Sequence, residues 1–113
     1  MANTFKLVTK ANVTSADVIY TVASGATTVV LGIMVGNTTT SQVTGTISIA
    51  STTSARAGNN DEANQTVELV TNAPIPAGGT LELLAGNKVV MEAGDALSLT
   101  ASGSSDIAVS IME

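Results

Sequence analysis

Thr27–Asn37 reads TTVVLGIMVGN, and this stretch decides the fold. Side chains along an extended strand alternate between two faces. One face would carry Val29, Leu31, Ile33 and Val35. The other would carry Val30, Gly32 and Met34. Both faces are apolar or small, which is typical of a central strand that is covered on both sides, by a facing sheet and by a second cover such as a neighbouring subunit.

The same alternation recurs in shorter runs on both sides of this stretch. The clearest is the last, in which Ile107, Val109 and Ile111 alternate with Ala108, Ser110 and Met112. Further runs lie at 5–8, 17–22, 46–50, 67–69, 81–83 and 97–100. No window has a helical stripe of useful length, so each run predicts a strand with one buried face.

Turn-forming residues separate these runs. Gly86-Asn87 lies between Leu81–Leu84 and Lys88–Glu92, a spacing typical of a tight hairpin. Ala73–Ala77 contains two prolines, which cannot donate to a central ladder, and it is interpreted as an extended crossing between sheets. The polar stretch 51–64 is longer than most connections in a compact domain, so we expect an exposed loop there.

Eight or nine short strands with frequent turns predict an all-β fold, an antiparallel β-sandwich that is Ig-like or jelly-roll-like. The pattern does not choose between those topologies. The chain of 113 residues fits a single domain, 1–113. An open sandwich has edge strands that can pair with other chains, and few lysines or prolines are available to guard them, which suits a protein that assembles.

Charged residues are scarce, and acidic ones predominate. They make up 12% of the chain, against roughly 25% in a typical soluble domain, so we expect part of the surface to be covered by a partner. The formal net charge is −5. The basic residues are Lys6, Lys10, Arg56 and Lys88. They are spread along the chain and cannot form the basic stripe that nucleic-acid binding requires.

The sequence offers no residues for catalysis. It has no His to activate a nucleophile, no Cys and no GxSxG elbow. Glu68, Glu82 and Glu92 lie on the polar phase of their runs, where solvated charges belong. No glycine-rich phosphate loop occurs. We therefore expect neither an enzyme nor a cofactor site.

The best candidate for a metal site is Asn59–Asn64, where Asn, Asp and Glu crowd together oxygen ligands of the kind that Ca²⁺ prefers. The spacing does not match an EF-hand loop. A solvated loop rich in turn formers explains the same residues, so no metal site is expected.

Neither a signal peptide nor a membrane helix is indicated. Met1–Lys6 lacks a charged region followed by an apolar region. The longest apolar stretch, Val29–Val35, is too short to span a bilayer. The expectation is a chain made and folded in a cytoplasm, with no membrane partner.

Candidate interface residues come from two places. Val30, Gly32 and Met34 form the second apolar face of the central strand, where glycine would let another backbone come close. Phe5 and Leu7 lie near the N-terminus, either in an ordinary first strand or in an arm that docks on a neighbouring subunit.

Five segments together resemble small virion proteins of tailed bacteriophages, notably those of marine and cyanobacterial hosts. They are Met1–Lys6, Asp17–Val22, Ala26–Gly32, Ala73–Gly79 and Val89–Leu97, and the likeness covers most of the chain. These motifs are strand and turn patterns, and the loop at 51–64 is longer than the pattern.

The resemblance implies a non-enzymatic β-sandwich subunit of a phage particle, with a capsid decoration (cement) protein as the best fit. Such proteins are typically trimers on the outside of the head, where they bridge capsomers. The implied partners are further copies in a homotrimer and the major capsid protein or another virion protein, and the implied location is the virion. A tail or fibre accessory subunit is the alternative. A receptor- or carbohydrate-binding module is less favoured, because Phe5 and Tyr20 are the only aromatic residues.

Overall fold

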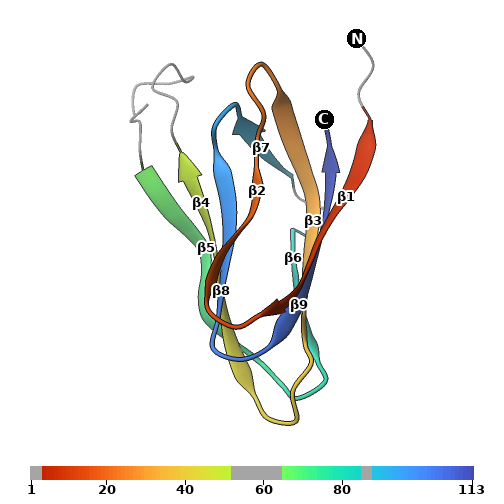
Figure 1. Ribbon diagram of the computed structural model, residues 1–113, viewed down its shortest axis with the longest axis vertical. Coiled ribbons are helices and arrows are strands. Elements are labelled where there is room, and N and C mark those ends of the chain that lie inside the picture. Colours follow the sequence, from red (N-terminus) through yellow and green to blue (C-terminus); the bar gives the residue numbers. More distant parts are fainter. Residues whose placement is uncertain (1–3, 52–64, 85–87) are drawn as a thin grey trace.

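The computed structural model describes residues 4–51, 65–84 and 88–113. These residues form nine strands and no helix, and the strands build two antiparallel sheets (Figure 1). The predicted antiparallel β-sandwich is therefore confirmed. The strands are β1 (Phe5–Val13), β2 (Ala16–Thr21), β3 (Thr27–Asn37), β4 (Val43–Ser51), β5 (Gln65–Ile75), β6 (Thr80–Leu83), β7 (Val89–Glu92), β8 (Ala96–Ala101) and β9 (Ser105–Met112).

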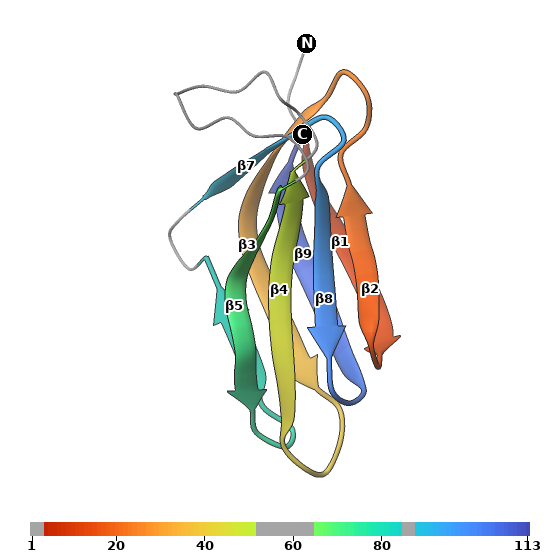
Figure 2. The same ribbon diagram turned by 90° about the vertical axis from the view of Figure 1, so that its left-hand side faces the viewer.

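The two sheets lie as separate layers, one behind the other in Figure 2. The five-stranded sheet has the order β1-β9-β3-β6, and β7 also pairs with β3. The four-stranded sheet has the order β2-β8-β4-β5. As predicted, β3 is central, because β9 pairs with one of its edges while β6 and β7 share the other.

The core fills the space between the inner faces of the sheets. Its fully buried members include Ile33, Val35, Val109 and Ile111 from one sheet and Ile47, Ile75, Leu97 and Leu99 from the other. Burying each such side chain contributes about 1.5–3 kcal/mol. The period-two apolar pattern of the sequence is thus the main determinant of this fold.

A β-bulge in β3 changes which residues face the core. The pairing of β3 with β9 shifts register between Val30 and Gly32, so Leu31 is an extra residue on β3. Val30 before the bulge and Ile33 after it are both 1% exposed. The prediction that Val30 points outward and Val29 inward is therefore wrong, because the extra residue reverses the phase of the strand.

The predicted hairpin between Leu81–Leu84 and Lys88–Glu92 is also wrong. β6 pairs with β3 at Ile33–Gly36, and β7 pairs with β3 at Thr27–Val30. Both are antiparallel to β3, so they run in the same direction, end to end along one edge. Because β3 is long, β6 and β7 each form backbone hydrogen bonds with a different part of it instead of pairing with each other.

Two predicted loop features fall largely outside the described residues. Ser51 ends β4, whereas residues 52–64, which include the Asn59–Asn64 stretch, are not described. The same holds for residues 85–87, which contain the predicted turn.

The edge strands are better guarded than the composition suggests. Lys6 and Lys10 both lie on the edge strand β1, opposite the inward-facing Ile111 and Ile107. Inward-pointing charges on an edge discourage pairing with another chain. Pro74 lies on the edge strand β5, and the β6–β7 edge consists of two strands of only 4 residues each. The expectation that the edges lack such residues is wrong, because the lysines and the proline that discourage strand pairing lie on the edge strands β1 and β5.

The proline segment is partly strand. Ala73–Ile75 complete β5 at the edge of its sheet, where a missing N–H is tolerated. The chain then crosses to the other sheet. The buried amide of Asn37, at the end of β3, donates to the carbonyl oxygens of Ile75 at 2.9 Å and Pro76 at 3.1 Å, which ties the two sheets together at this crossing.

Candidate docking surface

A row of apolar side chains crosses the outer face of the five-stranded sheet at the end where β1 starts and β9 ends. That end of the two strands is uppermost in Figure 1. Phe5 on β1 is opposite Met112 on β9, Met112 is opposite Val29 on β3, and Val29 is opposite Val90 on β7. Directly opposed side chains on one face lie about 5 Å apart. The four residues therefore form a continuous band, and we call Phe5, Met112, Val29 and Val90 the apolar row.

Four apolar side chains of this face are strongly exposed, whereas Val29 and Met112 are partly buried. Phe5 is 74% exposed, Leu7 68%, Val90 60% and Met34 50%. Single exposed apolar residues are ordinary, but a contiguous group is typical of a surface that contacts another molecule.

Four of the five residues predicted for an interface share this face. Phe5 belongs to the apolar row, Leu7 lies in the next row together with Gly32, and Met34 lies one row further down. A Cβ added at Gly32 would meet nothing within 4 Å, so the sheet is open there. Val30 is the exception, since the bulge places it in the core. The role of the other four in an interface stays a prediction.

The lower part of the same face is hollowed into a groove of about 460 Å³. Its lining includes Met34, Gly36, Thr80, Asp106 and Ala108. A Cβ added at Gly36 would meet nothing within 4 Å. Because three glycines and two alanines belong to the lining, side chains of a bound molecule could enter this part of the face.

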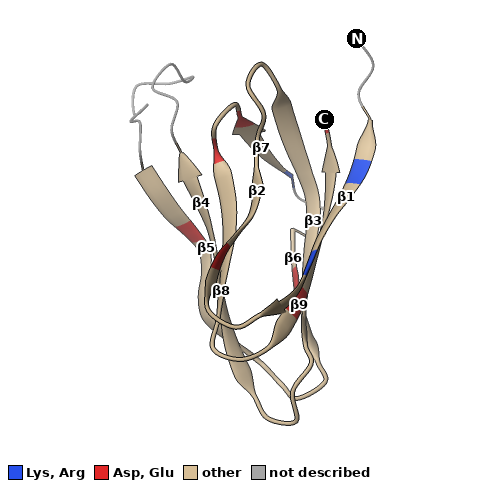
Figure 3. Cartoon of the chain, in the orientation of Figure 1, with Lys and Arg blue, Asp and Glu red and all other residues tan. Residues whose placement is uncertain are grey.

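Acidic side chains flank the apolar row but do not interrupt it. Glu92 is opposite Thr27, above the row. Below the row, Glu82 is opposite Met34 and Asp106 is opposite Gly36. Figure 3 shows how sparsely charged the two sheets are. The face therefore combines an apolar centre with acidic margins.

The lysines of β1 lie on the inward phase of the strand, and Lys10 also lines the groove. The ammonium group of Lys6 lies 3.5 Å from the carboxylate of Glu113, and that of Lys10 lies 3.5 Å from the carboxylate of Asp17. Lys88, which is exposed and directly precedes β7, is the remaining cation of the described residues.

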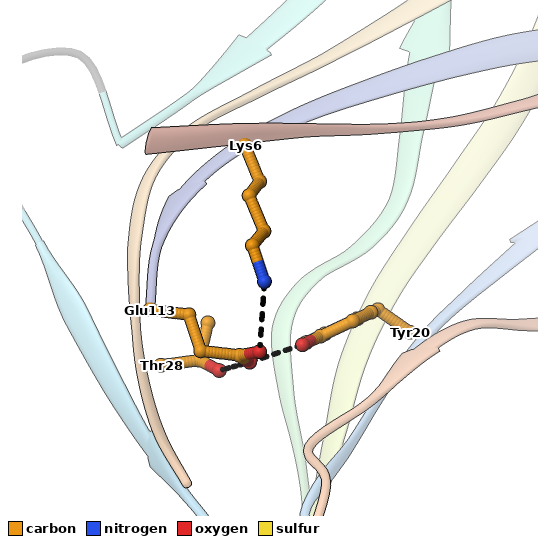
Figure 4. Close-up of polar contacts among 4 residues, drawn as sticks. All are labelled: Lys6, Tyr20, Thr28 and Glu113. Atoms are coloured by element: carbon orange, nitrogen blue, oxygen red, sulfur yellow. Dashed lines mark hydrogen bonds and ion pairs between the residues drawn. The ribbon is translucent and has the colours of Figure 1, made fainter. Parts of the chain in front are cut away.

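A polar cluster fixes the sheet beneath the apolar row (Figure 4). The carboxylate of Glu113 accepts hydrogen bonds from the Thr28 hydroxyl at 2.5 Å and from the Tyr20 hydroxyl, in addition to its ion pair with Lys6. The backbones of Thr4 and Glu113 exchange hydrogen bonds of 2.8 and 2.9 Å. Tyr20 belongs to the four-stranded sheet and Thr28 to the five-stranded sheet, so Glu113 links the two layers.

The cluster shifts the acid–base equilibria of both partners. The hydrogen bond from Thr28, followed by that from Tyr20, holds the pKa of Glu113 below its ordinary value. Burial, followed by the hydrogen bond to Glu113, raises the pKa of Tyr20. Both shifts favour a carboxylate that faces a protonated phenol, so at neutral pH the cluster is a structural clamp.

The outer face of the four-stranded sheet has a different chemistry. Thr46 and Ser48 on β4 are opposite Thr100 and Ser98 on β8, and all four share the phase that points away from the core. The same face also carries Thr44, Ala50 and Ala96. Val18 on β2 is exposed there at 57%, and Glu68 lies opposite Ser48. Hydroxyl groups thus dominate this face.

The three acidic residues noted in the sequence, Glu68, Glu82 and Glu92, lie on three different strands. In residues 4–51, 65–84 and 88–113, no group of three or more His, Cys, Asp or Glu could hold a metal ion. Glu68 lies in one sheet, and Glu82 and Glu92 lie on different strands of the other. The expectations that the chain is not an enzyme and takes no cofactor stay predictions.

The described segments also contain no helix with the length and hydropathy needed to cross a membrane.

No family model, no curated protein and no solved structure matches this chain. The function is therefore argued from the chemistry of the two outer faces.

Three of the four residues in the apolar row have no place in the interface predicted from sequence. The sequence prediction puts Val29 on the wrong face because it does not include the bulge, and it assigns Met112 and Val90 to no surface. Two features of the sequence indicate that Met112 and Val90 face outward. Met112 shares the outward phase of Ala108 and Ser110, and Val89-Val90-Met91 is apolar on both phases, just as β3 is.

Proposed function

We propose that this chain is a non-enzymatic structural protein of a tailed-phage virion, and that it decorates the outside of the capsid as a cement protein. The observation that carries the proposal is the apolar row, which spans four strands of one sheet. Its end residues Phe5 and Val90 are exposed, as are Leu7 and Met34 on the same face, and Val29 and Met112 are partly exposed. A decoration protein needs such a surface to grip the shell.

The contrast between the two outer faces supports this role. A protein that sits on a shell requires one adhesive face and one face that tolerates water. The apolar row supplies the first, and the Thr- and Ser-rich face of the four-stranded sheet supplies the second. The resemblance of the sequence to small virion proteins points to the same setting.

The proposed partner is the major capsid protein or another virion protein, and the proposed location is the virion. The homotrimer implied by the resemblance stays a prediction. Light scattering of the purified chain tests it, because a trimer has three times the mass of the 11.2 kDa chain.

The copy number of the chain per particle tests the proposed function. Quantitative mass spectrometry of virions, purified from the phage that encodes the chain, is expected to find hundreds of copies in each particle. A dozen copies or fewer would replace head decoration by a tail or fibre role, and absence from the particle would overturn the proposal.

A further inference from the structure

We infer that the outer face of the five-stranded sheet binds a protein surface in which an apolar ridge is flanked by Lys or Arg side chains, and that this surface belongs to a different protein rather than to a second copy. Only the partner's identity as a virion protein rests on the proposed function. The chemistry of the partner follows from the face itself.

The positions of the charges define the partner's pattern. Two residues along a strand span about 7 Å. Glu92 lies two residues beyond Val90 on β7, so it is about 7 Å above the apolar row. Glu82 lies in the row of Ala108, four residues from Met112 on β9 and about 13 Å below the apolar row. A matching partner would carry a cation beside its ridge, opposite Glu82.

The groove adds a second anionic position below the apolar row. Asp106 lies six residues from Met112, at about 20 Å, and lines the groove beside Gly36. One of its oxygens accepts the N–H of Asn12 at 3.0 Å, which fixes the carboxylate at that site. A long cationic side chain of the partner could lie along the open groove and reach it.

Charge complementarity argues against a second copy as the occupant. The face carries three carboxylates, from Glu82, Glu92 and Asp106, against one exposed lysine, Lys88, which directly precedes β7. Two such faces packed together would bring like charges into one interface, which opposes association. Lys6 and Lys10 compensate only in part. Each forms an ion pair, with Glu113 and Asp17 respectively, although Lys10 also lines the groove.

Strand addition between copies is opposed as well. The free edge strand β1 carries its two lysines on the inward phase, and such charges block edge-to-edge pairing. We therefore expect a partner to bind the outer face of the five-stranded sheet rather than the edge of β1.

Two matched pairs of variants test the inference. Val90→Ser and Glu82→Gln change the apolar row and its acidic margin. Val18→Ser and Glu68→Gln make the same changes on the outer face of the four-stranded sheet, where Val18 is 57% exposed against 60% for Val90. Circular dichroism and a thermal melt confirm that each variant is folded.

The first probe is agarose that carries phenylpropylamine groups, which combine an apolar ring with a cation. The chain is expected to bind at 50 mM NaCl and to be eluted by salt. Val90→Ser and Glu82→Gln should each weaken retention at least threefold, while Val18→Ser and Glu68→Gln leave it unchanged. Equal losses on the two faces would overturn the inference, whatever the fate of the proposed function.

The second probe is the purified phage head from which the chain has been stripped. Sedimentation of head-bound chain should show affinity falling about tenfold with Val90→Ser and about threefold with Glu82→Gln, and falling further from 50 to 500 mM NaCl. Binding that ignores both variants would overturn the inference while leaving the decoration role intact.

Light scattering tests the exclusion of a second copy. The mass of the chain in solution should be the same for the wild type and for Val90→Ser. A multimer that Val90→Ser dissociates would overturn the inference, because the face would then bind another copy.

Discussion

The two outer faces of this sandwich are made of the same kind of strand but do not resemble each other. On the five-stranded sheet the opposed residues are Phe5, Met112, Val29 and Val90. On the four-stranded sheet the opposed pairs are Thr46 with Thr100 and Ser48 with Ser98. The inner faces, in contrast, are both predominantly apolar. Stability is therefore set by the shared inner pattern, and the difference between the outer faces is where function must be sought.

The largest expected effect comes from two adjacent residues of β3 that lie on opposite sides of the sheet. Val30→Lys places an ammonium group in the core, and the desolvation of that charge should lower the free energy of unfolding by about 4 kcal/mol or more. Val29→Lys, on the outer face, should change it by less than about 1 kcal/mol. Urea unfolding followed by circular dichroism measures both. The opposite ranking would mean that the bulge is misplaced and that the apolar row does not exist.

The next effect concerns the end of the sandwich where the sheets are joined by Asn37. Asn37→Ala removes the amide that serves Ile75 and Pro76. The Pro76 carbonyl still accepts the N–H of Gly79, whereas the buried carbonyl of Ile75 loses this donor. The free energy of unfolding should fall by about 1–3 kcal/mol. The exposed Thr40→Ala in the adjoining loop is the control, and urea unfolding should show almost no change for it. A small decrease in the free energy of unfolding for Asn37→Ala would mean that contacts other than those of Asn37 hold the two sheets together at this end.

The opposite end, beneath the apolar row, should be sensitive to pH. The pKa of Glu113 is lower in the folded protein than the ordinary value of 4.5. The carboxylate therefore contributes stability that is fully present above that value and is lost as the pH falls through the lowered pKa. Glu113→Gln should cost about 1 kcal/mol at pH 7 and should flatten the decline of stability below pH 4.5.

Thermal melts of the wild type and Glu113→Gln between pH 3 and pH 7 measure this effect. The account predicts a flatter curve for Glu113→Gln. If its curve were parallel to that of the wild type, the clamp would have no part in holding the two sheets together.

The smallest effect separates two strand glycines on opposite faces. Gly36→Ala on the outer face has open space and should raise the free energy of unfolding by up to about 0.5 kcal/mol. Gly45→Ala on the inner face would place its Cβ 3.3 Å from Cδ1 of Ile75 and should lower it by about 1 kcal/mol. Urea unfolding of both variants is the measurement, and stabilisation by Gly45→Ala would mean that the core is looser there than its contacts indicate.

The sequence carries most of the fold and only part of the candidate site. Alternation alone predicts the central place of β3 and the inward phase of Ile107, Val109 and Ile111, because one buried face requires that period. The bulge at Leu31 has no comparable local signal, since Val29 and Val30 are the same residue type. For that reason the sequence predicts Val30 on the outer face and Val29 in the core, whereas the structure has Val29 on the outer face and Val30 in the core.

The pairing of strands that are distant in the sequence is the second feature that local sequence patterns do not predict. Gly86-Asn87 favours a hairpin, yet β6 and β7 both pair with β3. Val90 joins the apolar row only through that pairing, and Met112 only through the pairing of β9 with β1 and β3. The four residues of the row come from four separate strands, so their proximity depends on strand order.

The most direct test of the docking surface is hydroxyl-radical footprinting of the chain, free in solution and in its native assembly. Met34, at 50% exposed, should be oxidised readily in the free chain and protected in the assembly, together with Phe5. Met91, which is fully buried, should stay unreactive in both. A methionine introduced by Val18→Met on the other outer face should react equally in both. Equal oxidation of Met34 and Phe5 in the free and assembled chain would contradict the account.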